Sequence, residues 1–331
     1  MTKIKVGING FGRIGRSFFR QALLSDHIEV VAVNDLTDVA TLAHLLKYDS
    51  THGVLANTVS TSGDSITVDN LSVPVFSKAN PQELPWGSLN VDVVLESTGR
   101  FLKNEEALQH VIAGAKKVII SAPSSDAKTV VLGVNDEIIT AEDFVFSNAS
   151  CTTNCLAPLA KVIDDHFKIK SGYITTTHAF TADQRLQDSP HKDLRRARSA
   201  MNSIIPTQTG AASAVGKVLP NLNGKLDGIA LRVPVACGSI TDFVCVTEKD
   251  TTTDEVNAVL KAASENGMKG ILAVSEEPLV SIDIVGRKES SILDAELTKV
   301  SGNLIKLVSW YDNETGYSSR LIDLCDAVIT K

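Results

Sequence analysis

The sequence has few cysteines and no long run of apolar residues, and each shortage excludes a class of protein. Its five cysteines are an odd number in a chain of 331 residues and include no Cys-x-x-Cys pair. We therefore expect no disulfide framework, and a reducing cytoplasm is the expected location. No apolar stretch approaches the roughly 18 residues that suggest a membrane-spanning helix. The chain runs from Met1 directly into a strand, so we expect no signal peptide.

An excess of positive charge is also missing. The net charge is −7, which argues against general affinity for nucleic acid or membranes, and we expect no dedicated partner of either kind. Cys151 and Cys155 are one helical turn apart, but no nearby histidine or cysteine completes a zinc set, so no metal site is predicted. The composition, 43% hydrophobic and 21% charged, is that of an ordinary globular protein long enough for two domains.

The first 150 residues alternate between strand-like and helix-like segments. Strands separated by helical crossovers of this length predict a largely parallel, doubly wound sheet of the Rossmann type. The expected strands are Ile4–Ile8, Val30–Val33, Val91–Leu95, Val118–Ile120 and Val130–Leu132, and the expected helices are Arg16–Leu24 and Glu105–Ala115.

The pattern changes after residue 150. Longer strands that alternate in polarity predict an α+β domain over residues 151–314, with a mostly antiparallel sheet covered by helices on one face. A capping box beginning at Thr252 opens a helix that runs to Ala263. An amphipathic helix over about 315–331 is expected to pack back on the first domain. The expected strands are Tyr173–His178, Ile229–Val235, Ile240–Thr247, Val280–Val285 and Leu304–Trp310.

A glycine-rich motif follows the first strand. Residues 10–15 read Gly-x-Gly-x-x-Gly and open a helix, an arrangement that permits a tight turn, close approach of a pyrophosphate and close packing of helix on strand. Asp35 ends the second strand twenty residues after Gly15. A carboxylate there accepts hydrogen bonds from ribose hydroxyls and repels a 2′-phosphate. The motif predicts an NAD site, against the alternative that the glycines only make a turn and Asp35 caps a helix.

Cys151 lies where an apolar strand, residues 144–146, gives way to a helix. Unpaired N–H groups and the positive end of the helix dipole favour a thiolate at this position, and a thiolate is a nucleophile. The alternative is a small core residue at a tight turn, and spacing alone does not decide between the two.

Two further side chains are candidates for the same site. His178 ends a strand, and an imidazole can hold a thiolate and then move protons at neutral pH. A histidine there is otherwise an ordinary surface or core residue. Arg232 lies between Leu231 and Val233 within a strand, and an arginine in apolar surroundings needs a carboxylate or a phosphate. The basic run His191–Arg198 is interpreted, for some of its arginines, as a solvated or subunit-contacting face.

Four runs of sequence have specific patterns: Ile8–Arg16 (INGFGRIGR), Ser147–Cys155 (SNASCTTNC), Pro190–Arg198 (PHKDLRRAR) and Trp310–Glu314 (WYDNE). Together they resemble the phosphorylating glyceraldehyde-3-phosphate dehydrogenase family over essentially the whole chain. The resemblance implies a cytoplasmic, glycolytic homotetramer that uses NAD. Its substrates would be D-glyceraldehyde 3-phosphate and inorganic phosphate, and its product 1,3-bisphosphoglycerate. In the family, the segment from about Thr181 to Met201 lies between subunits.

The resemblance also implies roles for individual residues. Cys151 would form a hemithioacetal and then a thioester, with His178 as the acid–base residue. Thr181 and Arg232 would hold the substrate's phosphate, and the attacking phosphate would be received by Ser150, Thr152, Thr209 and Gly210. Asn313 would hold the nicotinamide carboxamide. The cofactor-binding positions are Gly10, Gly12, Arg13, Ile14, Gly15, Asp35, Ser121, Asn313 and Tyr317.

Some positions depart from the family pattern, and two rival functions stay open. Ala79 stands where an arginine near the adenine is expected, with Lys78 as a substitute, and Gln208 replaces a small hydroxyl residue. Residues 235–238 and Thr315 also differ from the residues that are common in the family at these positions. One rival is an erythrose-4-phosphate dehydrogenase, which shares the cysteine and histidine but typically releases an acid. The other is an NAD-binding protein whose main task is interaction.

Overall fold

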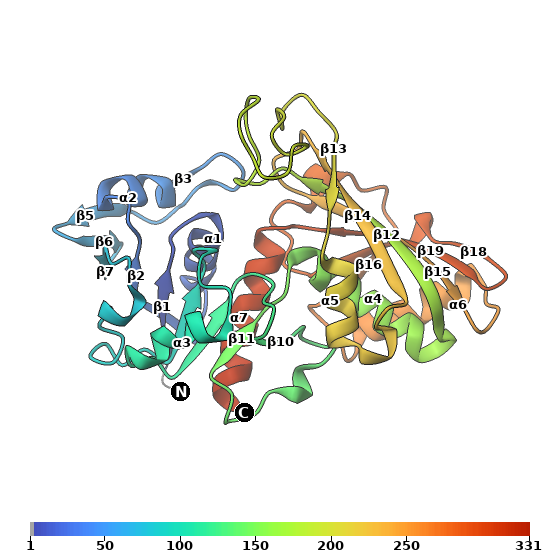
Figure 1. Cartoon of the computed structure of the whole chain (residues 1–331), viewed down its shortest axis with the longest axis horizontal. Coiled ribbons are helices and arrows are strands. Elements are labelled where there is room, and N and C mark those ends of the chain that lie inside the picture. Colours follow the sequence, from blue (N-terminus) through green and yellow to red (C-terminus); the bar gives the residue numbers. More distant parts are fainter. Residues whose placement is uncertain (1–2) are drawn as a thin grey trace. The chain divides into compact units, whose positions relative to one another are not determined.

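Two units, each built around its own sheet, make up the chain (Figure 1). The structure is a computed structural model that describes residues 3–331. The first unit contains the residues up to Val130 together with Asp136–Ala149 and Ser318–Lys331. The second contains Val131–Asn135 and Ser150–Tyr317. None of the helices in the described part of the chain is long and apolar enough to cross a membrane.

The sheet of the first unit is mainly parallel. Its strands lie in the order β10-β11-β9-β8-β1-β2-β7-β6-β5, and only β5 and β6 run antiparallel to their neighbours. The strand order reverses at β1, which pairs with both β2 and β8, so the carboxyl ends of these strands form the switch point at which such sheets bind ligands. The strands are β1 (Ile4–Asn9), β2 (Ile28–Asn34), β5 (Val59–Ser62), β6 (Ser65–Val68), β7 (Leu71–Phe76), β8 (Val93–Glu96), β9 (Lys117–Ile120), β10 (Lys128–Thr129) and β11 (Val145–Ser147).

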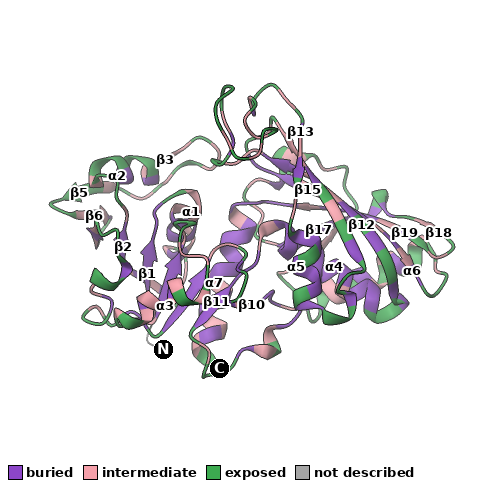
Figure 2. Ribbon diagram, in the orientation of Figure 1, coloured by how far each residue is buried: buried purple, intermediate pink, exposed green. Residues whose placement is uncertain are grey.

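Helices pack on this sheet and bury its central strands. Every residue of β8 and β9 is buried, and Figure 2 shows most of β1 in the colour of burial. Ser319, in the last helix, donates a hydrogen bond to the Gln21 side chain at 2.7 Å. The helices are α1 (Arg13–Ala22), α2 (Val39–Lys47), α3 (Asn104–Ile112) and α7 (Thr315–Thr330), with the short helices η1 (Pro81–Glu83) and η2 (Asp136–Ile138) and a small hairpin of β3 (Tyr48–Asp49) and β4 (Gly53–Val54).

The second unit has a mostly antiparallel sheet. Its order is β13-β14-β12-β15-β19-β17-β16, and β18 pairs with β19; only β12–β14 and β16–β17 are parallel pairs. The strands are β12 (Ile169–Ala179), β13 (Ile205–Gln208), β14 (Leu226–Val233), β15 (Ser239–Thr247), β16 (Leu272–Ser275), β17 (Ser291–Asp294), β18 (Lys299–Ser301) and β19 (Leu304–Tyr311). Residues along β15 alternate between buried and half-buried, as expected of a sheet with one covered face.

One long helix covers the middle of this second sheet. Helix α4 packs on β12, β15, β17 and β19, while α5 packs on β14 and α6 on β16. Their bounds are α4 (Cys151–Phe167), α5 (Ala211–Val218) and α6 (Thr253–Glu265), and the short helices are η3 (Pro220–Leu222), η4 (Ser281–Ile284) and η5 (Ala295–Leu297).

The predicted fold class is confirmed, and two predicted strands are wrong. The Val130–Leu132 segment follows the short strand β10 instead of forming a strand, because the Val131 N–H that a strand ladder needs donates to Asn135 Oδ1 at 2.8 Å. The Val280–Val285 segment contains the 3₁₀ helix η4. There the Asp283 carboxylate accepts the Val280 N–H at 2.8 Å and starts a helical turn, and Ile282 is 73% exposed.

Candidate active site

Cys151 occupies the first position of helix α4. The preceding residue, Ser150, is the N-cap, and its hydroxyl accepts the Thr153 N–H at 3.0 Å. The thiol therefore lies at the helix N-terminus, as the sequence predicts, and it is half-buried. At this position the dipole of a helix of 17 residues favours negative charge on sulfur.

His178 and Arg232 lie beside this thiol because of the pairing between two strands. His178 stands at the end of β12 and is the register partner of Arg232 on the parallel strand β14. The His178 Nε2 atom lies 3.3 Å from Cys151 Sγ, and Arg232 Nη1 lies 2.7 Å from the other ring nitrogen, Nδ1. Arg232 Nη1 also donates to Ala179 O at 3.0 Å. The three residues named from the sequence thus form a contiguous row.

Burial works against the helix dipole in setting the charge of this pair. Burial raises the pKa of the Cys151 thiol, and the Arg232 charge and the Thr152 N–H oppose the rise. Burial, followed by the charge of Arg232, lowers the pKa of His178 to about 3. Both directions favour a neutral thiol beside a neutral imidazole. The thiolate that the helix N-terminus alone would favour therefore forms only when its proton can move to His178.

Tyr311, which the sequence analysis did not single out, supports the site from the buried side. Its hydroxyl lies 2.8 Å from Thr152 Oγ1 and 2.8 Å from Thr176 Oγ1. Its ring meets that of His178 edge to face, with the centroids 5.9 Å apart. Burial raises the pKa of Tyr311 far above its ordinary value, so the phenol stays neutral and acts as a fixed support.

Several N–H groups of the second unit are suited to anions. Arg232 Nε is buried and has no hydrogen-bond partner among residues 3–331. Gly210 is the N-cap of α5 and provides no side chain to cap this helix start, a type of position that is suited to anions. Thr209 Oγ1 accepts the Ala211 N–H at 3.2 Å. These features suit phosphate groups.

Thr181 is held in its loop by a reciprocal pair of hydrogen bonds. Its N–H donates to Gln184 Oε1 at 3.3 Å, and the Gln184 N–H donates back to Thr181 O at 2.9 Å. The Gln184 side chain is only 8% exposed. The sequence analysis missed Gln184 because a glutamine in a loop has no pattern of its own.

Arg196 is a further cation of this region that the sequence analysis left inside a basic run. It donates to Asp183 Oδ2 at 2.6 Å and to Thr207 Oγ1 at 3.0 Å. Its charge contributes to the lowered pKa values of both His178 and Arg232. The signal in the sequence was the cluster of arginines in an acidic chain, but spacing did not distinguish Arg196 from its neighbours.

A cavity of about 250 Å³ lies at the carboxyl ends of β1, β2 and β8 in the first unit. Asp35 is fixed at its rim, because Oδ2 accepts the Phe11 N–H at 2.8 Å and Oδ1 accepts the Thr37 N–H at 2.9 Å. The lining residues are Asn9, Gly10, Gly12, Asn34, Asp35, Leu36, Lys78, Ala79, Ser97, Thr98, Arg100 and Phe101.

The glycine-rich turn beside this cavity fits a dinucleotide. Gly10 has φ +94°, and a Cβ on it would lie 2.7 Å from the Ser97 backbone, so only glycine fits there. A Cβ on Gly15 would overlap the Gly10 carbonyl oxygen. Helix α1 begins directly after Gly12 with no side-chain cap and no acidic residue in its first turn, which leaves its N-terminus suited to a pyrophosphate.

The remaining predicted cofactor residues are not all gathered at this cavity. Among the described residues its lining does not include Arg13, Ile14 or Ser121. Arg13 pairs with Asp49 at 3.2 Å, and Ser121 follows the end of β9. Both Lys78 and Ala79 line the cavity, so the lysine lies where a substitute for the expected arginine would have to be.

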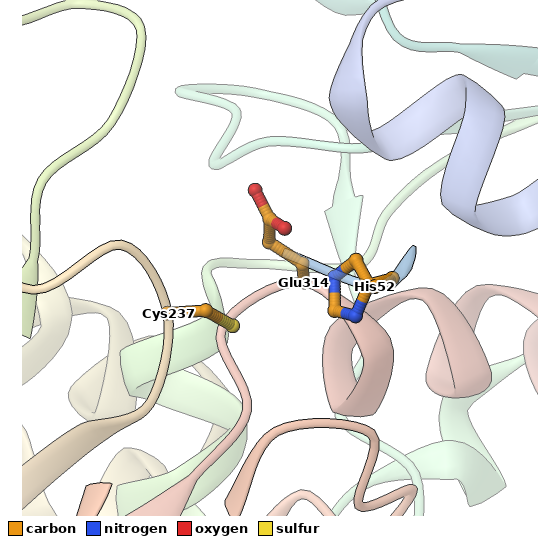
Figure 3. A group of neighbouring side chains, drawn as sticks. All are labelled: His52, Cys237 and Glu314. Carbon is orange, nitrogen blue, oxygen red and sulfur yellow. The ribbon is translucent and has the colours of Figure 1, made fainter. Parts of the chain in front are cut away.

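Asn313 and Tyr317 belong to the second unit and follow β19. Both are buried, at 6% and 5% exposure. The Asn313 Oδ1 atom accepts hydrogen bonds from Gly238 N at 3.2 Å and from Ser239 Oγ at 2.9 Å. The neighbouring Asp312 is also fixed, since its Oδ1 accepts from Cys237 Sγ at 3.1 Å and from Glu314 N at 2.8 Å; Cys237 and Glu314 are labelled in Figure 3.

Comparison with known proteins agrees with this arrangement along the chain. The family model described as glyceraldehyde 3-phosphate dehydrogenase, NAD binding domain, matches residues 4–104, and the model of the C-terminal domain matches residues 150–313. Glyceraldehyde-3-phosphate dehydrogenase of Geobacillus stearothermophilus is 58% identical over 331 residues, which cover 99% of each chain. Glyceraldehyde-3-phosphate dehydrogenase 2 of Streptomyces avermitilis is 57% identical over 326 residues (97% of each), and glyceraldehyde-3-phosphate dehydrogenase 1 of Bacillus cereus is 56% identical over 330 residues (99% of each). The chain belongs to the glyceraldehyde-3-phosphate dehydrogenase family of NAD-dependent oxidoreductases.

Proposed function

We propose that this chain oxidises D-glyceraldehyde 3-phosphate with NAD through a thioester on Cys151, and that inorganic phosphate releases the product as 1,3-bisphosphoglycerate. The observation that carries the proposal is the row formed by Cys151 Sγ, His178 and Arg232, with 3.3 Å between Sγ and Nε2. Family membership supports the reaction, and the geometry supports the residue roles.

The first step is attack of sulfur on the aldehyde. The step uses the tautomer of His178 that carries its proton on Nδ1, which lies 2.6 Å from the acceptor Ala179 O. The neutral imidazole takes the thiol proton through Nε2 as Cys151 Sγ bonds to the carbonyl carbon, and it returns that proton to the new hydroxyl oxygen. The pKa of His178, lowered by burial to about 3, leaves the ring unprotonated at neutral pH, so a ring nitrogen is free to accept a proton. Before proton return, the Cys151 N–H and the protonated imidazole stabilise the alkoxide of the hemithioacetal.

The second step converts the hemithioacetal to a thioester. NAD, when bound, supplies the hydride acceptor. His178 Nε2 takes the hydroxyl proton as the carbon–oxygen double bond reforms. Asn313 then has the role of holding the carboxamide, which sets the ring face presented to the substrate carbon. Sulfur donates weakly into a carbonyl, so the thioester keeps much of the energy of oxidation and stays open to attack.

The third step transfers the acyl group to phosphate. An oxygen of inorganic phosphate attacks the thioester carbon, the carbon–sulfur bond breaks, and Cys151 leaves as a thiolate that recovers the proton from His178. Arg232 and Thr181 hold the phosphate of the substrate. Ser150, Thr152, Thr209 and Gly210 receive the attacking phosphate, in keeping with the uncapped start of α5.

The proposal divides the chain into two functional domains. Residues 1–150, with the C-terminal helix over about 315–331, bind NAD, and residues 151–314 carry the chemistry. Asp35 lies at the rim of the cavity formed by the first unit, where its carboxylate accepts hydrogen bonds from the ribose and repels a 2′-phosphate. Gly10, Gly12, Arg13, Ile14, Gly15, Ser121 and Tyr317 complete the proposed cofactor contacts.

The working assembly proposed is a cytoplasmic homotetramer. Support comes from the segment between Thr181 and Met201, where Leu186, Leu194 and Met201 are 73%, 81% and 47% exposed. Apolar side chains gathered on one segment are a feature of surfaces that contact another subunit.

The test measures NADH formation from D-glyceraldehyde 3-phosphate and from erythrose 4-phosphate, each with and without inorganic phosphate. The proposal predicts rapid turnover of the triose that depends on phosphate. Faster turnover of the tetrose, or turnover of the triose that is indifferent to phosphate, would favour an erythrose-4-phosphate dehydrogenase that releases an acid. NAD binding with no NADH from either sugar would favour an interaction protein.

A further inference from the structure

Ser239, the first residue of β15, uses its hydroxyl in two buried hydrogen bonds. The residue is 1% exposed. Its Oγ donates to Asn313 Oδ1 at 2.9 Å and accepts the backbone N–H of Ala179 at 3.1 Å. A serine hydroxyl has one proton to donate, so the Asn313 bond fixes its direction and leaves the lone pairs for Ala179.

The first of these bonds sets the orientation of the Asn313 amide. Oδ1 accepts from two donors, Ser239 Oγ and Gly238 N, so rotating the amide would set its NH₂ group against both. The Nδ2 atom has no hydrogen-bond partner among residues 3–331, although Asn313 is only 6% exposed. Asn313 therefore presents a donor, and a ligand group facing it must be an acceptor such as a carbonyl oxygen.

The second bond ties this amide to the end of the strand that carries His178. The carbonyl of Ala179 accepts from Arg232 Nη1 at 3.0 Å and lies 2.6 Å from His178 Nδ1. The N–H of the same residue is held by Ser239. One hydroxyl thus joins Asn313 to the backbone that positions the acid–base side chain.

We propose that Ser239 is a positioning residue: it locks the Asn313 amide as a donor to the carbonyl oxygen of the nicotinamide carboxamide and holds that donor in register with His178. The inference rests on the proposed function, because it takes Asn313 to face the carboxamide. Gly238 and Asn313 are the chain neighbours of Cys237 and Glu314, whose side chains are seen in Figure 3.

The test compares the binding of two NAD analogues to the intact protein. Thionicotinamide adenine dinucleotide replaces the carboxamide oxygen with sulfur, a weak acceptor, whereas 3-acetylpyridine adenine dinucleotide keeps the oxygen and replaces the amide nitrogen with a methyl group. The unmodified protein should bind the acetyl analogue more tightly than the thio analogue. The preference is measured as the Kd of the thio analogue divided by the Kd of the acetyl analogue. In Ser239→Ala this ratio should fall about fivefold, the scale of one lost hydrogen bond, because the Asn313 amide can turn.

Three further variants make the result decisive. Thr247→Val removes a buried hydroxyl at the other end of β15, which donates to Lys249 O at 2.9 Å, and should leave the ratio unchanged. Ser239→Cys keeps the shape but donates weakly, and should lower the ratio even if Ser239→Ala fails to fold. Asn313→Ala should abolish the preference. If Asn313→Ala abolishes it while neither Ser239 variant changes it, the positioning role is overturned and the proposed function stands. If Asn313→Ala has no effect, the carboxamide contact itself is wrong.

Discussion

At the scale of single residues, the charge on Arg232 adds to burial in keeping the imidazole next to it unprotonated. Arg232 Nη1 is 2.7 Å from His178 Nδ1, and its charge adds to burial in lowering the pKa of His178 to about 3. In a Cys151→Ala background, which removes coupling to the thiol, Arg232→Gln should therefore raise the pKa of His178 by at least about one unit, toward 6.5. NMR titration of protein labelled in its histidine rings measures this pKa.

The sign of this change also sets the pH range in which His178 can accept a proton. A lowered pKa keeps His178 neutral well below pH 6.5, so its capacity as a base persists as the pH falls. After the substitution, that capacity should be lost as the pH falls through the raised pKa. Arg198→Gln is the matched control, since Arg198 is exposed and pairs with Asp188 at 2.7 Å; it should leave the titration unchanged. A pKa of His178 that stays put or falls in Arg232→Gln would contradict the account.

Asp35 supplies a second prediction at the same scale. Asp35→Asn keeps the shape and an oxygen for the Phe11 N–H but removes the negative charge at the cavity rim. NAD affinity should fall about tenfold and affinity for NADP should rise, because a charged hydrogen bond and a repulsion are lost. Dissociation constants for both cofactors provide the measurement, with Asp38→Asn, which keeps the N-cap of α2, as the control. An unchanged NAD-to-NADP ratio would exclude the ribose role of Asp35.

Individual residues could be predicted from the sequence where a local pattern marked them. Cys151 follows a strand and opens a helix, and an arginine at position 232 between apolar residues had to find a partner. Tyr311 and Ser239 had no such mark, because their importance comes from strand pairing that brings residues distant in the sequence into contact. Arg196 lay in a cluster of arginines, and spacing did not distinguish it from its neighbours. The burial of Cys151 and His178 also could not be predicted from the sequence, although this burial shifts the pKa values of both groups.

At the scale of helices and strands, the start of a helix can be predicted where a capping box of two side chains marks it. The capping box predicted at Thr252 is present: Thr252 Oγ1 accepts the Glu255 N–H at 3.2 Å, and the Glu255 carboxylate accepts the Thr252 N–H at 3.0 Å. Thr252→Ala should reduce the free energy of unfolding by about 1 kcal/mol, because an N–H at the start of α6 loses its acceptor.

Urea unfolding followed by circular dichroism measures that loss. Thr253→Ala, one residue later and without a capping role, is the control and should change stability by less than about 0.5 kcal/mol. Equal losses in the two variants would show that the box adds nothing to the stability of α6.

Apolar alternation alone is a weaker guide to an element. The segment Val280–Val285 alternates as a strand does, yet Asp283 caps a 3₁₀ turn there, and Ile282 is exposed. By contrast, β12 and β14 were predicted from the same kind of pattern and are present, because each pairs with neighbouring strands along most of its length. Pairing partners decide such cases, and they are not visible in a local run of residues.

At the scale of the whole molecule, the change from alternating strands and helices to longer strands predicted a parallel sheet followed by a mostly antiparallel one, and both are present. The two sheets carry different tasks in the proposal. The first presents strand ends and an uncapped helix start to a dinucleotide. The second brings a thiol, an imidazole and a guanidinium into one row by strand register.

The most direct test of the proposed reaction on Cys151 is intact-protein mass spectrometry with peptide mapping. After mixing with D-glyceraldehyde 3-phosphate and NAD in the absence of phosphate, the protein should carry one acyl group, attached at Cys151 and absent from Cys151→Ser. Adding inorganic phosphate should discharge it. An acyl group attached at another residue, or a protein that makes NADH while Cys151 stays unmodified throughout, would contradict the account.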